Sequence, residues 1–205
     1  MLFRSISTLS FALTDLVIGH LDQLPQVVRD GTFDLILLRP RGTLFQVVTQ
    51  DFQLRRIGKV AQGALVLAFA LATVHVDWTV GRAVMLAATI PAAVLIFASI
   101  WITAICIVFW TTDGNEAANA FTYGGNFLTQ YPINIYDRWI RRFLAYVVPT
   151  AFIAYFPALF ILGKADPLGL PVWLEVSSPL VAVAAAFAAG VVWRVAVRHY
   201  QSAGG

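Results

Sequence analysis

One long stretch of the chain carries no charged side chain. Between Arg82 and Asp113 thirty consecutive residues are uncharged, and residues 83–110 read AVMLAATIPAAVLIFASIWITAICIVFW. At 1.5 Å per residue, a helix of that length would exceed about 40 Å. The hydrocarbon core of a bilayer is only roughly 30 Å thick. The pattern therefore predicts a helix that crosses a membrane.

Four further apolar segments alternate with polar stretches, which predicts an all-α, multi-pass transmembrane helical bundle with about five spans. The first segment is the weakest, because it contains Arg4, Asp15 and several hydroxyl side chains. It either spans with its polar face against other helices or lies at the interface. The fourth carries Pro149 and Pro157, which predict a kinked helix. The predicted spans are residues 3–21, 60–76, 83–110, 143–162 and 179–193.

Composition agrees with a membrane protein. Hydrophobic residues make up 59% of the 205 residues and charged residues 12%, against about 25% charged residues in soluble domains. Five spans leave no room for a separate soluble catalytic domain. The net charge of +3 is explained by Lys and Arg in cytoplasmic loops, so it does not indicate nucleic-acid binding. Cys106 is the only cysteine, which excludes an intrachain disulfide.

The basic residues predict the orientation of the chain. If residues 22–59 lie in the cytoplasm, eleven basic residues fall on that side and three on the other, as the positive-inside rule requires. We therefore expect a single transmembrane domain over residues 1–205. It would have cytoplasmic loops at 22–59 and 111–142, an outer loop at 163–178 and a cytoplasmic C-terminus. The expected cytoplasmic cations are Arg29, Arg39, Arg41, Arg55, Arg56, Lys59, Arg138, Arg141, Arg142, Arg194 and Arg198.

Side chains suited to catalysis are scarce. The histidines His20, His75 and His199 have no partner at metal-ligand spacing. The sequence contains neither the phosphate-binding motif G-x-x-x-x-G-K-[ST] nor the motif G-x-S-x-G. We thus predict no catalytic, cofactor-binding or metal-binding residues, and a protein that is not an enzyme. Asp15 is the one charge well inside a predicted span, and such charges usually mark transport pathways.

The loop over residues 22–59 begins with the pattern LDQLPQVVRDGTFDLILLRP. It predicts a short amphipathic helix over residues 24–30, a break at Gly31 and a second apolar turn over residues 33–38. This turn would end at Arg39 and Pro40, because a proline biases the preceding residue towards an extended conformation. Two readings are open at this point. The segment either lies flat among anionic lipid headgroups or docks against a soluble partner.

This pattern is part of a wider resemblance to the ABC-2 family of bacterial ABC transporter permeases. The other matching runs are DFQLRRIGKVAQG, ANAFTYGGNFLTQYPINIYDRWIRRFLAYVVPTAFIAYFPALFILG and the C-terminal RHYQSAGG. The most similar group has permeases that are commonly encoded in pairs beside an ATP-binding subunit. The resemblance covers essentially the whole chain.

The resemblance implies a type V exporter-like architecture in a bacterial inner membrane, with six spans per permease, two permease chains and two ATPase subunits. ATP and Mg would be bound by the ATPase partner and not by this chain. The loop after the family's second span would carry the ATPase-coupling helix. In this sequence that loop is residues 22–40, with Asp30, Gly31, Asp34, Arg39 and Pro40 at the matching positions. Residues 3–21 would be the family's second span, so either the start is too late or this member is truncated.

The stretch 111–142 also matches the family, and its polar, glycine-bearing cluster has two readings. It either packs structurally or forms a cytoplasmic gate or second docking surface, for which we single out Tyr123, Gly124, Gly125 and Arg138. The expected function is the permease subunit of an ABC exporter. The alternatives are a stand-alone secondary transporter or channel, a membrane enzyme acting on lipids, and an accessory membrane subunit.

Overall fold

The computed structural model is an elongated bundle of helices, and every regular element among the described residues is helical. The structure describes residues 1–50, 53–111, 120, 123–124, 126, 129–130, 137, 148–164 and 172–200. The elements are α1 (Leu2–Ile18), η1 (Gly19–Gln23), α2 (Leu24–Arg29), α3 (Phe33–Leu37), α4 (Thr43–Val48), α5 (Arg55–Thr73), α6 (Val80–Ile105), η2 (Cys106–Phe109), η5 (Thr150–Phe152), α9 (Tyr155–Leu162), α10 (Val172–Glu175) and α11 (Ser178–Arg198).

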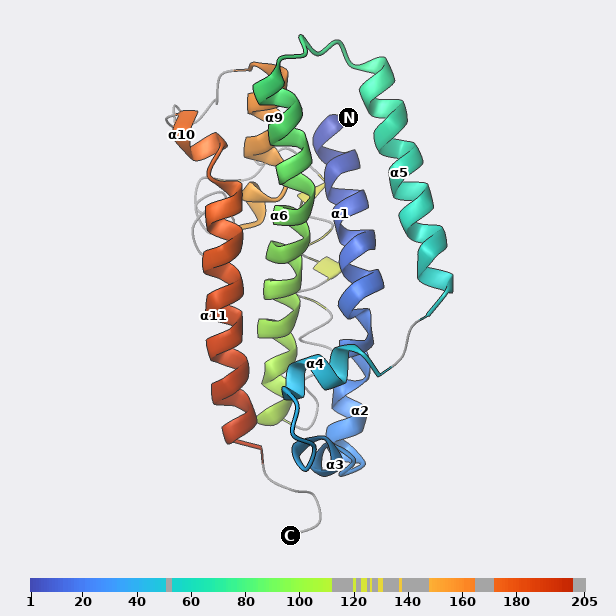
Figure 1. Ribbon diagram of the computed structural model, residues 1–205, viewed down its shortest axis with the longest axis vertical. Coiled ribbons are helices and arrows are strands. Elements are labelled where there is room, and N and C mark those ends of the chain that lie inside the picture. The colour runs from blue at the N-terminus through green and yellow to red at the C-terminus, as the bar shows by residue number, and fades with distance from the viewer. Residues whose placement is uncertain are drawn as a thin grey trace.

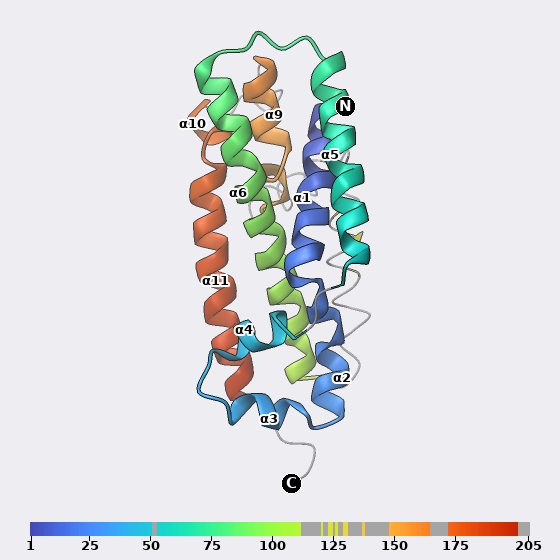
Figure 2. The ribbon, with the colours of Figure 1, turned by 45° about the vertical axis from the view of Figure 1, so that its right-hand side comes forward.

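Four helices in the described part of the chain are long and apolar enough to cross a membrane: Leu2–Arg29, Arg55–Thr73, Val80–Phe109 and Ser178–Arg198. They correspond to four of the five predicted spans and confirm an all-α, multi-pass membrane protein. Figures 1 and 2 show α1, α5, α6 and α11 running along the long axis. The short helices α3 and α4 lie at one end, and α9 and α10 lie at the other.

The fifth predicted span, residues 143–162, is described from residue 148 onwards and contains the shorter apolar helix Thr150–Leu162. The chain breaks between η5 and α9 at Ala154, whose φ of −145° and ψ of −32° are not helical. Pro149 directly precedes η5, and Pro157 lies in the first turn of α9, where a missing N–H costs little. The interruption predicted from the prolines is therefore present, and it lies between them.

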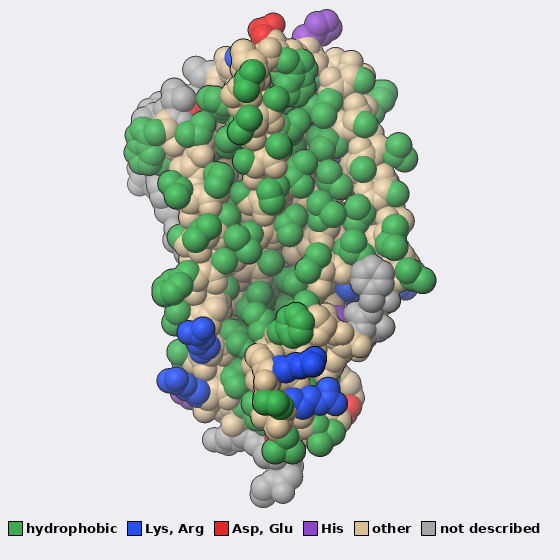
Figure 3. Space-filling view, in the orientation of Figure 1, with side chains coloured by type: hydrophobic (Ala, Val, Ile, Leu, Met, Phe, Trp, Pro, Cys, Tyr) green, Lys and Arg blue, Asp and Glu red, His purple; other side chains and the backbone are tan. Residues whose placement is uncertain are grey.

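The core of the bundle forms around α6, which packs against α1, α9 and α11. Ile6, Ile96, Phe156 and Ile161 are fully buried there. The outer faces of α5 and α11, by contrast, expose large apolar side chains in the same middle zone that Figure 3 shows as largely hydrophobic. An apolar surface of this extent is stable when lipid surrounds it. In a soluble protein it would instead mark a site that binds a membrane or another protein.

Basic residues gather at one end of the bundle. The end formed by α2, α3, α4 and the last turns of α11 carries most of the described arginines, and Figure 3 shows Lys and Arg side chains around its lower part. Arg4, Arg82 and Lys164 belong to elements at the opposite end. We call the end formed by α2, α3, α4 and the last turns of α11 the basic end. It is the end for which the sequence predicts a cytoplasmic location.

Helices α1 and α5 approach each other closely at Gly63. A Cβ atom built on this residue would lie 2.9 Å from the Leu9 Cα atom, which is backbone and has no room to move aside. Gly58, on the same helix, has open space around the corresponding position. Gly63 is therefore required for the packing of the two helices, and Gly58 is not.

We expect Gly63→Ala and Gly58→Ala to change stability in opposite directions. The first should lower the free energy of unfolding by about 1–3 kcal/mol, because it overpacks the α1–α5 contact. The second should raise it by up to about 1 kcal/mol, because alanine favours the helix. Unfolding in detergent with increasing dodecyl sulfate, followed by circular dichroism, measures both. Equal effects of the two substitutions would contradict the close approach.

Candidate functional site

The segment from α2 to α4 lies at the basic end and contains the five predicted ATPase-coupling residues. The helix of the first span does not stop where the sequence predicted, at residue 21. It continues through η1 and α2 to Arg29, so α2 extends the same rod. Gly31 then reverses the chain with φ at +69°, a conformation that glycine adopts without steric cost. The predicted break at Gly31 is confirmed. Figure 2 shows α3 lying across the end of the bundle.

Helix α3 has two distinct faces. Phe33 and Ile36 are buried, at 0% and 3% exposure, and point towards the spans. Leu35 and Leu38 are 60% and 81% exposed on the other side. Arg39 follows them and is also exposed. The helix therefore uses one side for packing and presents apolar and cationic groups on the other.

Aromatic contacts join the inner face of α3 to two spans. The ring centroid of Phe33 lies 5.2 Å from that of Phe109, which ends the α6 span, and 4.9 Å from that of Tyr200, just after α11. Phe109 in turn contacts Trp193 of α11 at 5.7 Å. We call Phe33, Phe109, Trp193 and Tyr200 the aromatic joint. A displacement of α3 would be passed directly to both helices, because close-packed side chains transmit strain.

Hydrogen bonds from α4 fix the same arrangement. The Gln46 side-chain amide donates to the carbonyl oxygens of Ile36, at 3.1 Å, and Arg41, at 2.8 Å. The Trp193 indole N–H donates to the Thr43 hydroxyl at 3.0 Å. Helix α4 therefore ties the end of α3 to α11.

The predicted coupling residues occupy different environments. Asp30 is exposed and accepts two hydrogen bonds from the Gln26 amide, at 2.8 and 2.9 Å. Asp34 is half-buried beside Tyr200. Burial, and then the adjacent Asp34 carboxylate, raise the pKa of the Tyr200 hydroxyl above its ordinary value. Arg39 and Pro40 are exposed and close the segment.

Asp15, the charge that the sequence placed inside the first span, is held by cations of α5. Its carboxylate lies 2.7 Å from the Lys59 Nζ atom and 3.5 Å from the Arg56 Nε atom. The Arg56 guanidinium also donates to the Asp15 carbonyl oxygen at 2.8 Å. Since Asp15 is 3% exposed and Arg56 11%, this pair is largely shielded from water, whereas Lys59 is 57% exposed. The ion pairs give Asp15 a structural role without requiring a transport pathway.

A second acidic residue, Asp22, lies in η1, where the helix of the first span continues towards α2, and it holds this part of the helix in place. Its carboxylate accepts hydrogen bonds from the Trp101 indole at 3.1 Å and from the Tyr123 hydroxyl at 2.9 Å. Phe11 stacks on Trp101 and meets Tyr123 edge-on, with centroids 5.9 and 5.8 Å apart. We call Phe11, Asp22, Trp101 and Tyr123 the polar anchor. Sequence reasoning missed Asp22 and Trp101 as functional candidates, although Trp101 lies well inside the predicted span 83–110.

The other predicted gate residues are only partly described. Gly124 is half-buried, and a Cβ atom added there would meet open space. Gly125 and Arg138 lie outside the described residues. We expected the whole of 111–142 on the cytoplasmic side, yet the Thr129 hydroxyl shares a buried hydrogen bond with Ser7 in the interior of α1. Tyr123 and Thr129 thus lie against the first span, and the boundaries of the loop stay a prediction.

Comparison with known proteins identifies the family. A family model described as an ABC-2 family transporter protein matches residues 1–204. The chain belongs to the ABC-2 transporter family. Comparisons with curated proteins and with solved structures gave no match. An ABC-2 permease is a membrane-embedded transporter component and not itself catalytic, and the family generally works with an ABC ATPase. No group of His, Cys, Asp or Glu side chains suited to a metal ion occurs among the described residues.

The ion pairs predict a large difference between two neighbouring arginines. Arg56→Gln should lower the free energy of unfolding by about 3 kcal/mol, because it leaves the buried Asp15 carboxylate without its shielded partner. Arg55→Gln is the matched control. Arg55 is exposed, so the change should stay within about 0.5 kcal/mol. Unfolding in detergent measures both, and a similar small loss for each would show that the pair does not hold α1 against α5.

Proposed function

We propose that this chain is the permease subunit of an ABC exporter in a bacterial inner membrane, driven by ATP hydrolysis in a separate ATP-binding subunit. That subunit, which would bind ATP and Mg, docks on the outer face of α3. The observation that carries the proposal is the division of α3 into a packed inner face and an outer face with Leu35, Leu38 and Arg39 exposed. Family membership supports the class of transporter.

The position of α3 across the end of the bundle favours docking over a location among lipid headgroups (Figure 2). Its inner face packs against Phe109 and Tyr200, which lie at the ends of α6 and α11. Leu35 and Leu38 lie on the other side and are exposed. The outer face of α3 would therefore be turned away from the bilayer and towards water, where exposed leucines favour a protein partner.

The aromatic joint supplies the route for coupling. Closure of the ATPase would push on the outer face of α3, and Phe33 would pass the displacement to Phe109 and Tyr200. Helices α6 and α11 would then move together relative to α1. We further propose that Tyr123 belongs to a cytoplasmic gate, since its bond to Asp22 joins the stretch around residue 123 to the rod that carries α3.

A second permease chain is the remaining expected partner. Helices α5 and α11 expose large apolar side chains, among them Phe69 at 64% and Phe187 at 76%. Lipid and a second permease would both cover such faces. A stand-alone secondary carrier is less well supported, because its coupling site would need an available charge near the membrane midplane. Asp15 is already committed to Arg56 and Lys59.

Reversal of the charge at Arg39 tests the docking surface. Arg39→Glu should uncouple ATP hydrolysis from the permease, so that transport-linked stimulation of the ATPase is lost while membrane insertion stays intact. Asp34→Lys should have the same effect, with an added disturbance at Tyr200. The measurement is ATPase activity of the complex reconstituted in vesicles, together with co-purification of the ATP-binding subunit.

Lys164→Glu is the matched control for this experiment. It reverses a charge that is also exposed, at the opposite end of the bundle, and should leave the stimulation unchanged. If Arg39→Glu also retained wild-type stimulation and co-purification, the ATPase would not dock on α3.

The native Cys106, which is buried beside the aromatic joint, can report on the gate. Tyr123→Phe keeps the ring contacts but removes the hydrogen bond to Asp22. A bond to a charged group contributes about 1.5–3 kcal/mol, so opening should become at least about tenfold more frequent. We expect Cys106 in the ATP-free complex to react with a charged maleimide faster by that factor. Tyr155→Phe, at the far end of the bundle, should not change the rate, and an unchanged rate in Tyr123→Phe would argue for plain packing.

A further inference from the structure

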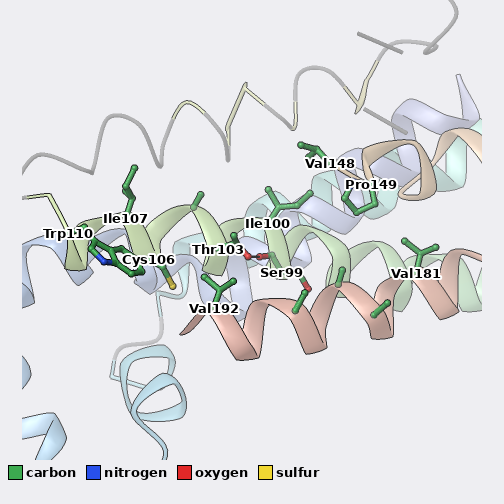
Figure 4. A pocket seen from close by; sticks show the side chains of 14 residues that line it. Ser99, Ile100, Thr103, Cys106, Ile107, Trp110, Val148, Pro149, Val181 and Val192 are labelled. Atoms are coloured by element: carbon green, nitrogen blue, oxygen red, sulfur yellow. Dashed lines mark hydrogen bonds between the residues drawn. The ribbon is translucent and has the colours of Figure 1, made fainter. Parts of the chain in front are cut away.

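A groove runs between α6 and α11 near the basic end. Its volume is about 760 Å³, and Val148 and Pro149 close one side of it (Figure 4). The described lining is apolar except for Ser99 and Thr103. Both hydroxyls already donate to carbonyl oxygens of their own helix, at 2.6 Å to Leu95 and 2.7 Å to Ser99. The described lining therefore offers hydrocarbon contacts, and both of its hydroxyls already have hydrogen-bond partners.

The length of the groove matches one leaflet of a bilayer. Along α11 it extends from Val181 to Val192, which corresponds to about 16 Å of helix. Half of a hydrocarbon core of roughly 30 Å is about 15 Å. Thr103 and Ile107 are exposed along α6, and Ala188 is exposed along α11. The groove is therefore open on one side over its length.

The lower end of the groove carries the groups expected beside a lipid headgroup. Trp110 lines this end, and its ring lies 5.5 Å from that of His199. Tryptophan is enriched at membrane interfaces. Arg198, next to His199, is exposed on the last turn of α11, where its long side chain can reach a phosphate. The charge at this end is thus complementary to an anionic headgroup.

We propose that this groove holds one acyl chain of an anionic phospholipid from the leaflet at the basic end, with the headgroup bound by Arg198. An acyl chain fits better than a helix of a second permease. A helix of this length and 10 Å diameter occupies about 1,300 Å³, which exceeds the 760 Å³ available. Small side chains such as Ala184 and Ala188 leave a narrow channel suited to a chain of methylenes. The proposal does not depend on ATP coupling.

The test uses the full chain in its complex, in vesicles of phosphatidylglycerol that carries a diazirine on one acyl chain. After illumination, mass spectrometry locates the labelled residues. We expect labels concentrated on residues 99–110 and 181–192, above the level on the exposed outer faces of α5 and α11. Labels spread evenly over all exposed faces would overturn the proposal, because they would show bulk lipid only. An unlabelled groove beside labelled outer faces would also overturn it, because protein would then cover the groove.

Variants separate the chain site from the headgroup site. Ala188→Trp fills the groove and should abolish the concentrated labelling, whereas Val183→Trp, on an exposed face of α11 outside the lining, should not. Arg198→Gln should weaken the preference for phosphatidylglycerol over phosphatidylcholine by about fivefold, whereas Arg194→Gln, on the same exposed face as Val183, should not. Equal labelling by the two lipids in the wild-type complex would overturn the assignment of an anionic headgroup. The wild-type labelling pattern decides the chain site even if a variant fails to fold.

Discussion

The burial of Asp15 is the constraint on which the rest of the basic end depends. A carboxylate at 3% exposure is stable only beside cations, since the desolvation of an unpaired charge costs several kcal/mol. Arg56 and Lys59 lie at the start of α5, so the ion pairs fix the height of α1 relative to α5. Everything that follows Asp15 in the rod must then project past the start of α5. The position of α3 is a consequence of this register.

The span over residues 83–110 was predictable, because thirty consecutive residues without a charged side chain are suited to the interior of a bilayer. The break at Gly31 was predictable because its glycine lies between two apolar turns. Continuation of the first span to Arg29 was not, because Asp22 and Gln23 read as a loop when their partners are unknown. The bonds from Trp101 and Tyr123 to Asp22 join residues about 80 and 100 positions apart. Hydropathy indicates whether a side chain prefers lipid or water, and it carries no information about such partners.

The faces of α3 illustrate the same limit within the candidate site. Residues 33–38 read FDLILL, and a helix of five residues is too short for its periodicity to define a buried side. Tertiary packing makes the choice: Phe33 fits between Phe109 and Tyr200, which leaves Leu35 and Leu38 outside. The sequence resemblance singled out this segment as the one that would meet a partner. It could not separate residues that would meet a partner from those that hold the segment in place.

Helix α11 connects the two surfaces for which we propose ligands. It contacts α4 through Trp193, and Tyr200 just after its end contacts α3. The preceding turns line the groove up to Val192. A lipid in the groove and an ATPase on α3 would therefore act on the same helix. If both favour particular positions of α11, each changes the affinity of the chain for the other. The factor is the same in both directions, because coupling between two sites is reciprocal. Lipid composition would then tune the affinity of the ATPase without contact between the two ligands.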